Sequence, residues 1–535
     1  MQDTFLDLHD IQGNIVKAYG RYGFPKGRYL FLEVCDAERA RAFVLALAPS
    51  ITTSAPWRMR DEGATAGAPI PACATNVAFT YHGLRELGVP RASLQTFPDE
   101  FAMGMRARCD ILGDDARSAP ACWDPIWRRK QPVDVMISVV GQDDACLGQR
   151  HDEIVALIDA SGGGVKLLGG HRGADGAEDL SYQSASAIYV GGQPTAKEHF
   201  GYTDGIGDPF FKGTYAHASN LIGNGKVVPG YPASDAKGWA PLETGEFLLG
   251  YKDEALESPE APSPKLLAHN GTFMVYRKLH QNVGAFDAYL QRAGSELPGG
   301  KEWLAAKLAG RWRNGAPLVR FPTEREADAF AARWEQAKQA IRDARDAPAR
   351  TAAKARFSAL NAQFAAFDYD DDQAGARCPM GAHIRRAHPR SALAFGDPEA
   401  FETPDALSNR RRIIRRGLPY GDATQRTDHD EHGIIFMALG ASIRRQFEFV
   451  QQQWMNYGND FRLGNDRDPL VGNHPTDEEG RGAGSMVIPS PRGSGKAPFF
   501  CSRLPRFVET RGGDYFFVPS LTALRMIGEG SIDPT

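Results

Sequence analysis

The chain has 535 residues, of which 42% are hydrophobic and 24% charged, a composition typical of a globular protein with more than one core. Its 62 basic and 66 acidic residues give a formal net charge of −4, which excludes nucleic acid or an anionic membrane as an expected partner. No apolar run approaches the ~20 residues of a membrane span, the N-terminus lacks a secretory-signal pattern, and the cysteines are scattered, so we expect a cytoplasmic protein with reduced thiols.

Four short apolar strands, each followed by an amphipathic helix, are predicted along the chain. The first pair of strands is RYLFLEV at 28–34 and VDVMISVVG at 133–141. The second pair is GTFMVYRKL at 271–279 and GIIFMALG at 433–440. After each strand, apolar residues recur at helical spacing. These residues are Ala40, Phe43, Val44 and Leu47; Leu147, Ile154 and Ile158; Val283, Phe286 and Leu290; and Ile443, Phe447, Val450 and Trp454.

The pairing of these units predicts the fold. Two strand-helix units with an intervening strand pair make a β-α-β-β-α-β arrangement, an antiparallel sheet with helices on one face. We therefore expect an α+β fold with two such domains, at 1–215 and 216–535. The region after the boundary is rich in Gly, Pro, Ala and Ser and is predicted as loops, apart from a strand at 245–251.

A helical insertion is predicted at 324–367. Thr323 and Glu326 form a capping-box pattern at its start. Pro348 is expected to end the first helix, and a second helix follows.

Two segments far apart in the sequence carry the candidate chemistry. Asp204 lies among glycines and aromatic residues in EHFGYTDGIGDPF, at 198–210. His383 lies in CPMGAHIRRAHPR, at 378–390, and is followed by Arg385 and Arg386. A single histidine is more often a surface or hydrogen-bonded core residue than a metal ligand. An imidazole beside small residues and two guanidinium groups also fits a large, flat, anionic cofactor such as haem.

A third segment, RRRIIRRGLPYG at 410–421, is rich in arginine. One interpretation is a solvated basic strand or a nucleic-acid patch, and the overall charge disfavours the latter. The other is that one arginine turns inward. Together with Asp204 it would supply a proton acceptor and a fixed cation, the two groups that cleavage of a peroxide O–O bond on iron requires.

These segments together resemble the dye-decolourising peroxidases, a family of haem peroxidases. FGYTDGIGDP is similar to the G-x-x-D-G signature of that family, CPMGAHIRRAHPR to its proximal-histidine segment, and IIRRGLPYG to its distal-arginine segment. GIIFMALGASIRRQFEFVQQQWMN at 433–456 and HDIQGNIV at 9–16 also resemble family segments. The resemblance therefore spans nearly the whole chain, in order.

On the proximal side, the resemblance implies that His383 is the ligand of the haem b iron. A carboxylate usually holds the proximal imidazole in this family, and Asp468 in RDPLVG is the expected residue, with Asp460 as the alternative. Arg385 and Arg386 are expected to bind the cofactor through its propionates.

On the distal side, the resemblance implies that Asp204 is the acid/base and Arg415 the distal arginine. We choose Arg415 over Arg416 because it is the first arginine of the RRG that aligns with the family segment. The implied enzyme reduces hydrogen peroxide and oxidises dyes, phenols or other aromatic donors by one-electron steps.

The family fold is two ferredoxin-like domains with haem between sheet and helices, which agrees with the strand-helix units. The chain departs from the family in the long interval between His383 and Arg415, where AFGDPEAFETPDAL at 394–407 is interpreted as an extra surface loop. Two rival hypotheses are a haem-binding carrier or haem-iron extraction protein, and a scaffold without haem. The sequence leaves open whether the chain forms a homo-oligomer.

Overall fold

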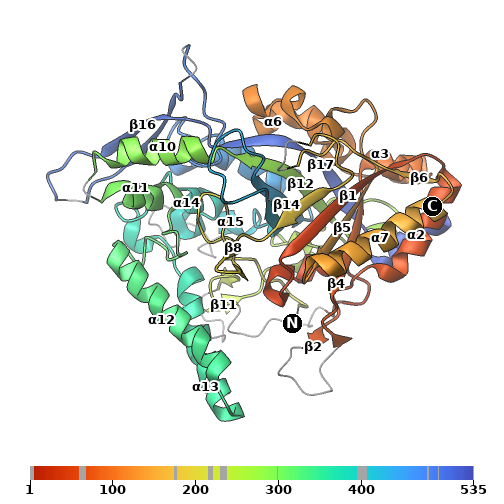
Figure 1. Ribbon diagram of the computed structural model, residues 1–535, viewed down its shortest axis with the longest axis horizontal. Coiled ribbons are helices and arrows are strands. Elements are labelled where there is room, and N and C mark those ends of the chain that lie inside the picture. Colours follow the sequence, from red (N-terminus) through yellow and green to blue (C-terminus); the bar gives the residue numbers. More distant parts are fainter. Residues whose placement is uncertain are drawn as a thin grey trace.

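The computed structural model describes residues 5–58, 68–173, 177–214, 221–228, 238–297, 299–394, 406–478, 481–491 and 493–533. Within these residues, nine strands form one antiparallel sheet at the centre of the molecule, and helices cover it (Figure 1). The strands of this sheet are β1 (Lys26–Val34), β4 (Cys73–Phe79), β5 (Val135–Gly141), β6 (Val165–Leu167), β7 (Gln183–Ser186), β12 (Thr272–Gln281), β13 (Ile414–Tyr420), β14 (Gly433–Gly440) and β17 (Val508–Val518).

The sheet consists of two halves with the same topology. Its strands lie in the order β13-β14-β12-β17-β4-β5-β1-β6, and β7 also pairs with β1. Numbered along the chain, the strands of each half therefore follow the spatial order second, third, first, fourth. This is the order of the β-α-β-β-α-β arrangement that the sequence predicts. The predicted α+β fold with antiparallel pairing is confirmed.

The predicted strand-helix units lie where the sequence places them. Helices α2 (Ala37–Leu47) and α7 (Asp144–Ala160) each begin after an aspartate, Asp36 and Asp143, whose side chain accepts a hydrogen bond from the first turn. Helix α10 (Val283–Gly294) follows β12, and two π-helical segments at 444–448 and 450–455 follow β14. The apolar residues predicted for α2, α7 and α10 are buried.

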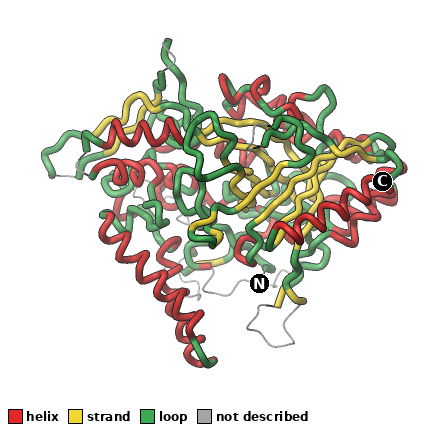
Figure 2. Tube along the Cα trace, viewed as in Figure 1, coloured by secondary structure: helices red, strands yellow, loops and turns green. Residues whose placement is uncertain are grey.

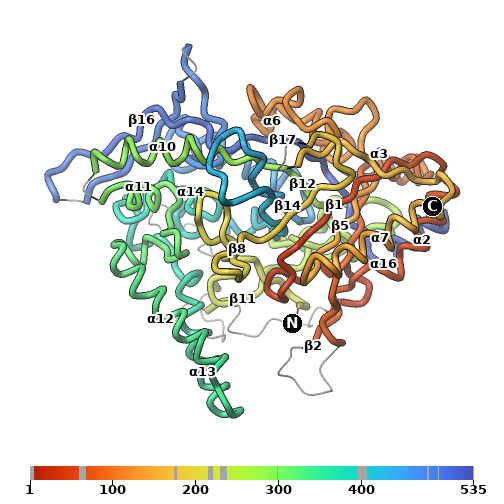
Figure 3. The backbone as a smooth tube through the Cα atoms, in the orientation of Figure 1, coloured from red at the N-terminus to blue at the C-terminus, as the bar shows by residue number. Residues whose placement is uncertain are grey.

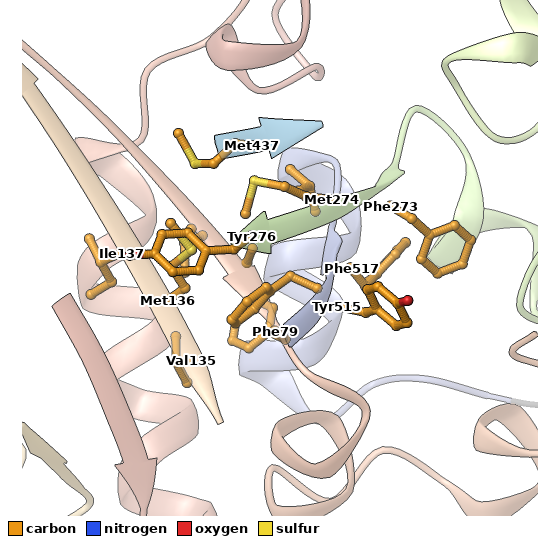
Figure 4. Packing of buried hydrophobic residues seen from close by; sticks show 14 of the residues in the cluster. Phe79, Val135, Met136, Ile137, Phe273, Met274, Tyr276, Met437, Tyr515 and Phe517 are labelled. Atoms are coloured by element: carbon orange, nitrogen blue, oxygen red, sulfur yellow. The ribbon is translucent and has the colours of Figure 1, made fainter. Parts of the chain in front are cut away.

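A shared core joins the two halves of the sheet. Phe517 on β17 pairs with Phe79 on β4 across the junction, and aromatic and methionine side chains from both halves pack around it (Figure 4). The C-terminal helix α16 (Leu521–Glu529) packs against α2 of the first half, as the tube in Figure 3 shows. The halves therefore bury apolar surface in common. The predicted boundary between residues 215 and 216 lies outside the described residues and stays a prediction.

The helical insertion projects from the body of the molecule as a pair of packed helices, α12 (Glu324–Asp343) and α13 (Ala347–Ala365), in Figure 2. The capping box of Thr323 and Glu326 is confirmed. The prediction for Pro348 is wrong: the first helix ends five residues earlier, and Pro348 lies in the first turn of α13, where its missing N–H costs nothing.

The strand predicted at 245–251 is also wrong. Residues Thr244–Glu246 form a 3₁₀ turn, and a hydrogen bond of 2.8 Å from the Gly245 N–H to the Lys252 carbonyl folds the segment back on itself. The apolar side chains here are buried by this compact turn rather than by strand pairing.

The remaining elements are short, and in the described residues none of the helices has the length and apolar character needed to cross a membrane. The helices are α1 (Gly13–Val16), α3 (Tyr81–Glu86), α4 (Arg91–Leu94), α5 (Asp99–Met103), α6 (Cys109–Leu112), α9 (Lys265–Ala268), α11 (Gly300–Ala309), α14 (His383–Ala387) and α15 (Ala406–Asn409). The strands are β2 (Trp57–Arg58), β3 (Ala68–Pro69), β8 (Tyr189–Val190), β9 (Gln193–Pro194), β10 (Lys226–Val227), β11 (Trp239–Ala240), β15 (Gly484–Ile488) and β16 (Phe499–Leu504).

Candidate functional site

A buried carboxylate holds the imidazole of His383. His383 is the first residue of α14, and its Nδ1 lies 2.9 Å from Oδ2 of Asp468. The other oxygen, Oδ1 of Asp468, accepts hydrogen bonds of 2.9 Å from the N–H groups of Leu470 and Val471. Because an ionised carboxylate only accepts hydrogen bonds, Nδ1 of His383 is the donor and Nε2 carries the lone pair. The imidazole is therefore oriented with Nε2 available to a metal.

Each member of this pair stabilises the charge of the other. Burial would raise the pKa of Asp468, but His383 and backbone N–H groups hold that pKa below its ordinary value. Burial would lower the pKa of His383, and the Asp468 carboxylate raises it instead. The imidazole consequently has a strongly electron-donating neighbour, the arrangement that makes a histidine a good ligand.

The alternative carboxylate, Asp460, is engaged elsewhere. Its Oδ2 accepts a hydrogen bond of 3.1 Å from Nε1 of Trp454. Of the two aspartates that the sequence offers, Asp468 is the one that contacts His383.

The guanidinium groups of Arg385 and Arg386 are hydrogen-bonded to backbone carbonyl groups. Arg385 is fully buried, donates to the carbonyl groups of Asp372 and Cys378, and lies 4.2 Å above the ring of Tyr369. Arg386 is also fully buried and donates to the backbone carbonyl groups of Gly381, Trp454, Tyr457 and Asp466. These contacts hold the backbone around His383. The prediction that these two arginines bind the propionates stays a prediction.

The distal segment brings Asp204 and Arg415 together. Nη1 of Arg415 donates a hydrogen bond of 2.6 Å to Oδ1 of Asp204, and Nη2 donates one of 3.1 Å to the carbonyl of Ile206. The N–H of Gly205 also donates to Oδ1 of Asp204, at 2.6 Å. Gly201 and Gly205 have φ angles of 91° and 74°, which L-residues adopt only with strain, so the loop needs glycine at these positions.

The neighbouring Arg416 points away from Asp204. It pairs with Asp208 at 2.8 Å and donates to the carbonyl groups of Asn14 and Ile15. Because side chains alternate along a strand, β13 presents only one of these two arginines to Asp204. That arginine is Arg415, the residue chosen from the sequence.

Glu198, which the sequence reasoning missed, shapes the loop that carries Asp204. Its carboxylate is buried and accepts hydrogen bonds from the N–H groups of Phe200 at 2.9 Å and Tyr202 at 2.7 Å. Nε2 of Gln281, on β12, donates a third hydrogen bond of 2.5 Å. The signal that could have indicated this role is an acidic residue at the start of a glycine-rich turn, where backbone N–H groups need an acceptor.

The proximal and distal groups lie close to one another. The side chains of Asp204, Arg415 and His383 keep 51%, 36% and 35% of their surface accessible. Burial nevertheless has a strong effect on all three pKa values, because protein surrounds them. The charges of Asp204 and Arg415 also shift the pKa of His383. The Asp204–Arg415 pair therefore lies close enough to the imidazole of His383 for their charges to interact.

The electrostatics of the distal pair keep Asp204 ionised. Burial would raise the pKa of Asp204, but the Arg415 guanidinium and the Gly205 N–H hold it below its ordinary value. The Asp204 carboxylate in turn raises the pKa of Arg415. The site thus contains a carboxylate that can accept a proton, next to a cation that stays charged.

A cluster of positive charge adjoins these groups and fits an anionic cofactor. Burial lowers the pKa of His388 well below its ordinary value, and Arg412, Arg390, Arg311 and Arg415 lower it further. Burial, followed by the charge of Arg390, lowers the pKa of Arg311 to about 9. Like charges inside a protein favour the binding of an anion, and the propionates of haem are suitable anions. With Nε2 of His383 available to iron, the residues of this site fit haem.

Comparison with known proteins finds relatives that are similar over nearly the whole chain. Residues 10–172 match the DyP dimeric alpha+beta barrel domain. The chain is 27% identical to the dye-decolorizing peroxidase msp1 of Mycetinis scorodonius, over 98% of this chain and 88% of the relative. It is 26% identical to the multifunctional dye peroxidase DyP2 of an Amycolatopsis species, over 97% of this chain and 96% of the relative.

The fold agrees with these relatives. An ancestral D-type dye decolorizing peroxidase superposes with a TM-score of 0.68 at 26% identity, over 98% of this chain and 99% of that structure. The dye-decolorizing peroxidase of Auricularia auricula-judae, at 23% identity, has the same fold, with a TM-score of 0.69 over 98% of this chain and 100% of that structure. The domain match, the relatives that align over nearly the whole chain and the shared fold together show that this chain is similar to the dye-decolourising peroxidases.

Proposed function

We propose that the chain is a haem b peroxidase that reduces hydrogen peroxide and oxidises dyes, phenols or other aromatic donors by one-electron steps. The observation that carries this proposal is the Asp204–Arg415 pair close to the carboxylate-held His383. Haem, when bound there, supplies the redox chemistry of peroxide reduction and donor oxidation. The protein supplies the binding, the orientation and the movement of protons.

Asp204 acts as the acid/base on the peroxide side. Its carboxylate is ionised and one oxygen accepts from both Arg415 and Gly205. The other oxygen, Oδ2, accepts the proton of hydrogen peroxide and returns it to the departing oxygen as water forms. No atom lies within 4 Å of the position that a Cβ on Gly205 would occupy, so glycine leaves this part of the loop open.

Arg415 stabilises the negative charge that develops when the O–O bond breaks. Its guanidinium is positioned by Asp204 and by the carbonyl of Ile206, so it needs no reorganisation during the reaction. Two N–H donors of the guanidinium thereby hold the loop in place, while its positive charge stabilises the negative charge that develops in the reaction.

His383 is the proposed iron ligand through Nε2, and Asp468 is the residue that orients it. Arg311 and Arg390, whose charges lower the pKa of His388, are proposed as further partners of the propionates beside Arg385 and Arg386. We further propose the cytoplasm as the compartment, since all seven cysteines are free thiols.

An absorption spectrum of protein from iron-supplemented cells tests the proposal. We expect a strong Soret band in the wild type, a lost or shifted band in His383→Ala, and an unchanged band in His429→Ala, a control at an exposed histidine. Oxidation of a phenol by hydrogen peroxide should accompany the band. If the folded, haem-supplemented wild type shows no Soret band, the proposal that the chain is a haem peroxidase is refuted. Release of iron from intact porphyrin without peroxide turnover would instead establish the haem-iron extraction protein.

A further inference from the structure

Two cysteines outside the candidate functional site lie over one glycine. Cys73 begins β4, and Cys146 lies in the first turn of α7. Gly141, the last residue of β5, pairs with Cys73 across the sheet. A Cβ atom placed on Gly141 would be 3.1 Å from Sγ of Cys146 and 3.2 Å from Sγ of Cys73. Because glycine has no side chain, the two thiols meet in the space that a Cβ would occupy.

The two thiols differ in reactivity. Burial, followed by a hydrogen bond with Cys146, raises the pKa of Cys73 to about 12. Cys146 is only half-buried, and its Sγ contacts the carbonyl oxygens of Ala72 and Asp143 at 3.3 Å. It also lies at the N-terminus of a 17-residue helix, where the helix dipole favours a thiolate. Cys146 is therefore the more exposed of the two thiols, and the buried Cys73 lies next to it.

We propose that Cys73 and Cys146 are a peroxide-sensitive dithiol that forms a disulfide bond. The thiolate of Cys146 attacks one oxygen of hydrogen peroxide, so that an S–O bond forms and the O–O bond breaks. The departing hydroxide takes up the proton that the Cys146 thiol released and leaves as water. The sulfur of Cys73 then attacks Sγ of Cys146, so that an S–S bond forms, the S–O bond breaks and a second water leaves. Two thiols are oxidised and one hydrogen peroxide is reduced to two water molecules.

The bond would join α7 to the sheet. Cys73 lies at one end of β4 and Cys146 at the start of the helix that covers β5. A disulfide bond between Cys73 and Cys146 closes the loop of chain between them. It removes conformational freedom from the unfolded chain and so stabilises the folded protein. The proposed consequence is a protein that resists unfolding when peroxide exceeds the supply of reductant.

Thiol mapping of the reduced holoenzyme tests this proposal. The protein is treated with a small excess of hydrogen peroxide, quenched with catalase, denatured and alkylated with N-ethylmaleimide. We expect two fewer alkylated thiols than the seven of the untreated chain, and a peptide pair linked through Cys73 and Cys146. Reduction with dithiothreitol should restore both thiols.

Three variants make the outcome specific. Cys73→Ser should stop Cys146 at a sulfenic acid, which dimedone traps, and Cys146→Ser should leave Cys73 reduced. Cys109→Ser, a control at another half-buried cysteine, should keep the linkage. His383→Ala should also form the linkage, because the dithiol does not depend on haem. Full alkylation of both cysteines after peroxide treatment of the wild type would overturn the proposal.

Discussion

Nη1 of Arg415 donates a hydrogen bond of 2.6 Å to Oδ1 of Asp204, although the two residues are 211 positions apart in the sequence. This contact joins the edge strand β13 to the glycine-rich loop that follows Glu198. It also sets the protonation of the carboxylate, because burial alone would raise the pKa of Asp204 and the guanidinium lowers it. The contact therefore couples the geometry of the distal side to its proton chemistry.

Asp204→Asn should slow the reaction with hydrogen peroxide by about 10²–10⁴-fold, the usual contribution of a positioned acid/base. Asparagine keeps the size of the side chain and can still accept from Arg415, but it cannot take up the peroxide proton. Stopped-flow mixing with peroxide measures the rate constant directly. Asp208→Asn is the matched control. The side chain of Asp208 pairs with the side chain of Arg416 and contacts Arg415 only through the backbone N–H of Arg415. An unchanged rate constant in Asp204→Asn would remove the acid/base role.

Arg415→Leu should change the pH dependence of the same step. Without the guanidinium, the effect of burial on Asp204 is no longer opposed, so its pKa rises. The carboxylate then becomes protonated at a higher pH, and the acid limb of the pH–rate profile moves upward. Arg415→Lys retains a charge and should move the limb less.

The pH–rate profile separates this effect from a loss of charge stabilisation. Loss of stabilisation alone would lower the rate constant at every pH and leave the acid limb in place. A limb that stays at the wild-type pH in Arg415→Leu would contradict the role of Arg415 in holding Asp204 ionised.

Much of the fold could be predicted from the sequence, because each main strand is a continuous apolar run. The strands β1, β5, β12 and β14 lie within a few residues of the predicted ranges. The segment at 245–251 has the same local character, but backbone hydrogen bonds to Thr244 and Lys252 fold it into a turn. Local pattern could not distinguish pairing in a sheet from burial in a compact turn.

The site was harder to predict, because the type of a residue does not show which way its side chain points in the fold. Arg385 and Arg386 follow His383 directly, yet their guanidinium groups bind backbone carbonyls from segments as distant as Asp466. Arg311 lies in an unremarkable loop and reaches the site only through tertiary packing. The contact between His383 and Asp468 was expected only from the family resemblance, since 85 positions separate the two residues.

Glu198→Gln should slow the peroxide reaction without changing the KM for the reductant. Glutamine replaces one acceptor oxygen of Glu198 with an NH₂ group, which would face the N–H donors of Phe200, Tyr202 or Gln281. The loop then moves, and Asp204 moves with it. We expect a loss of about 1–3 kcal/mol in unfolding free energy, the usual cost of an unsatisfied buried polar group.

Kinetics distinguish positioning from a purely structural role for Glu198. Steady-state titration of the reductant and stopped-flow mixing with peroxide are measured in the same preparation. Glu335→Gln, at an exposed residue of α12, is the control. A lower unfolding free energy with a wild-type peroxide rate constant would show that Glu198 supports the fold and not the position of Asp204.

Asp514→Asn should stabilise the protein near neutral pH and remove part of its pH dependence. Burial raises the pKa of Asp514 to about 6, even though its Oδ1 accepts hydrogen bonds from the N–H groups of Met105 and Tyr515. In the unfolded chain an aspartate has a pKa of about 3.9. Between these two values the folded state binds the proton and the unfolded state does not, so the stability of the wild type falls as pH rises.

Urea unfolding of both proteins between about pH 4 and pH 8 measures this effect. The difference in unfolding free energy should be near zero at the acid end, where the Asp514 carboxyl is protonated. It should grow as pH rises and level off above the folded pKa of about 6, at up to roughly 3 kcal/mol in favour of Asp514→Asn. Asp110→Asn, at an exposed aspartate, should give no such trend. Asparagine retains the acceptor oxygen for both N–H groups. A difference in unfolding free energy of the same size at every pH would therefore mean that the substitution changes packing. It would also mean that ionisation of Asp514 does not destabilise the fold.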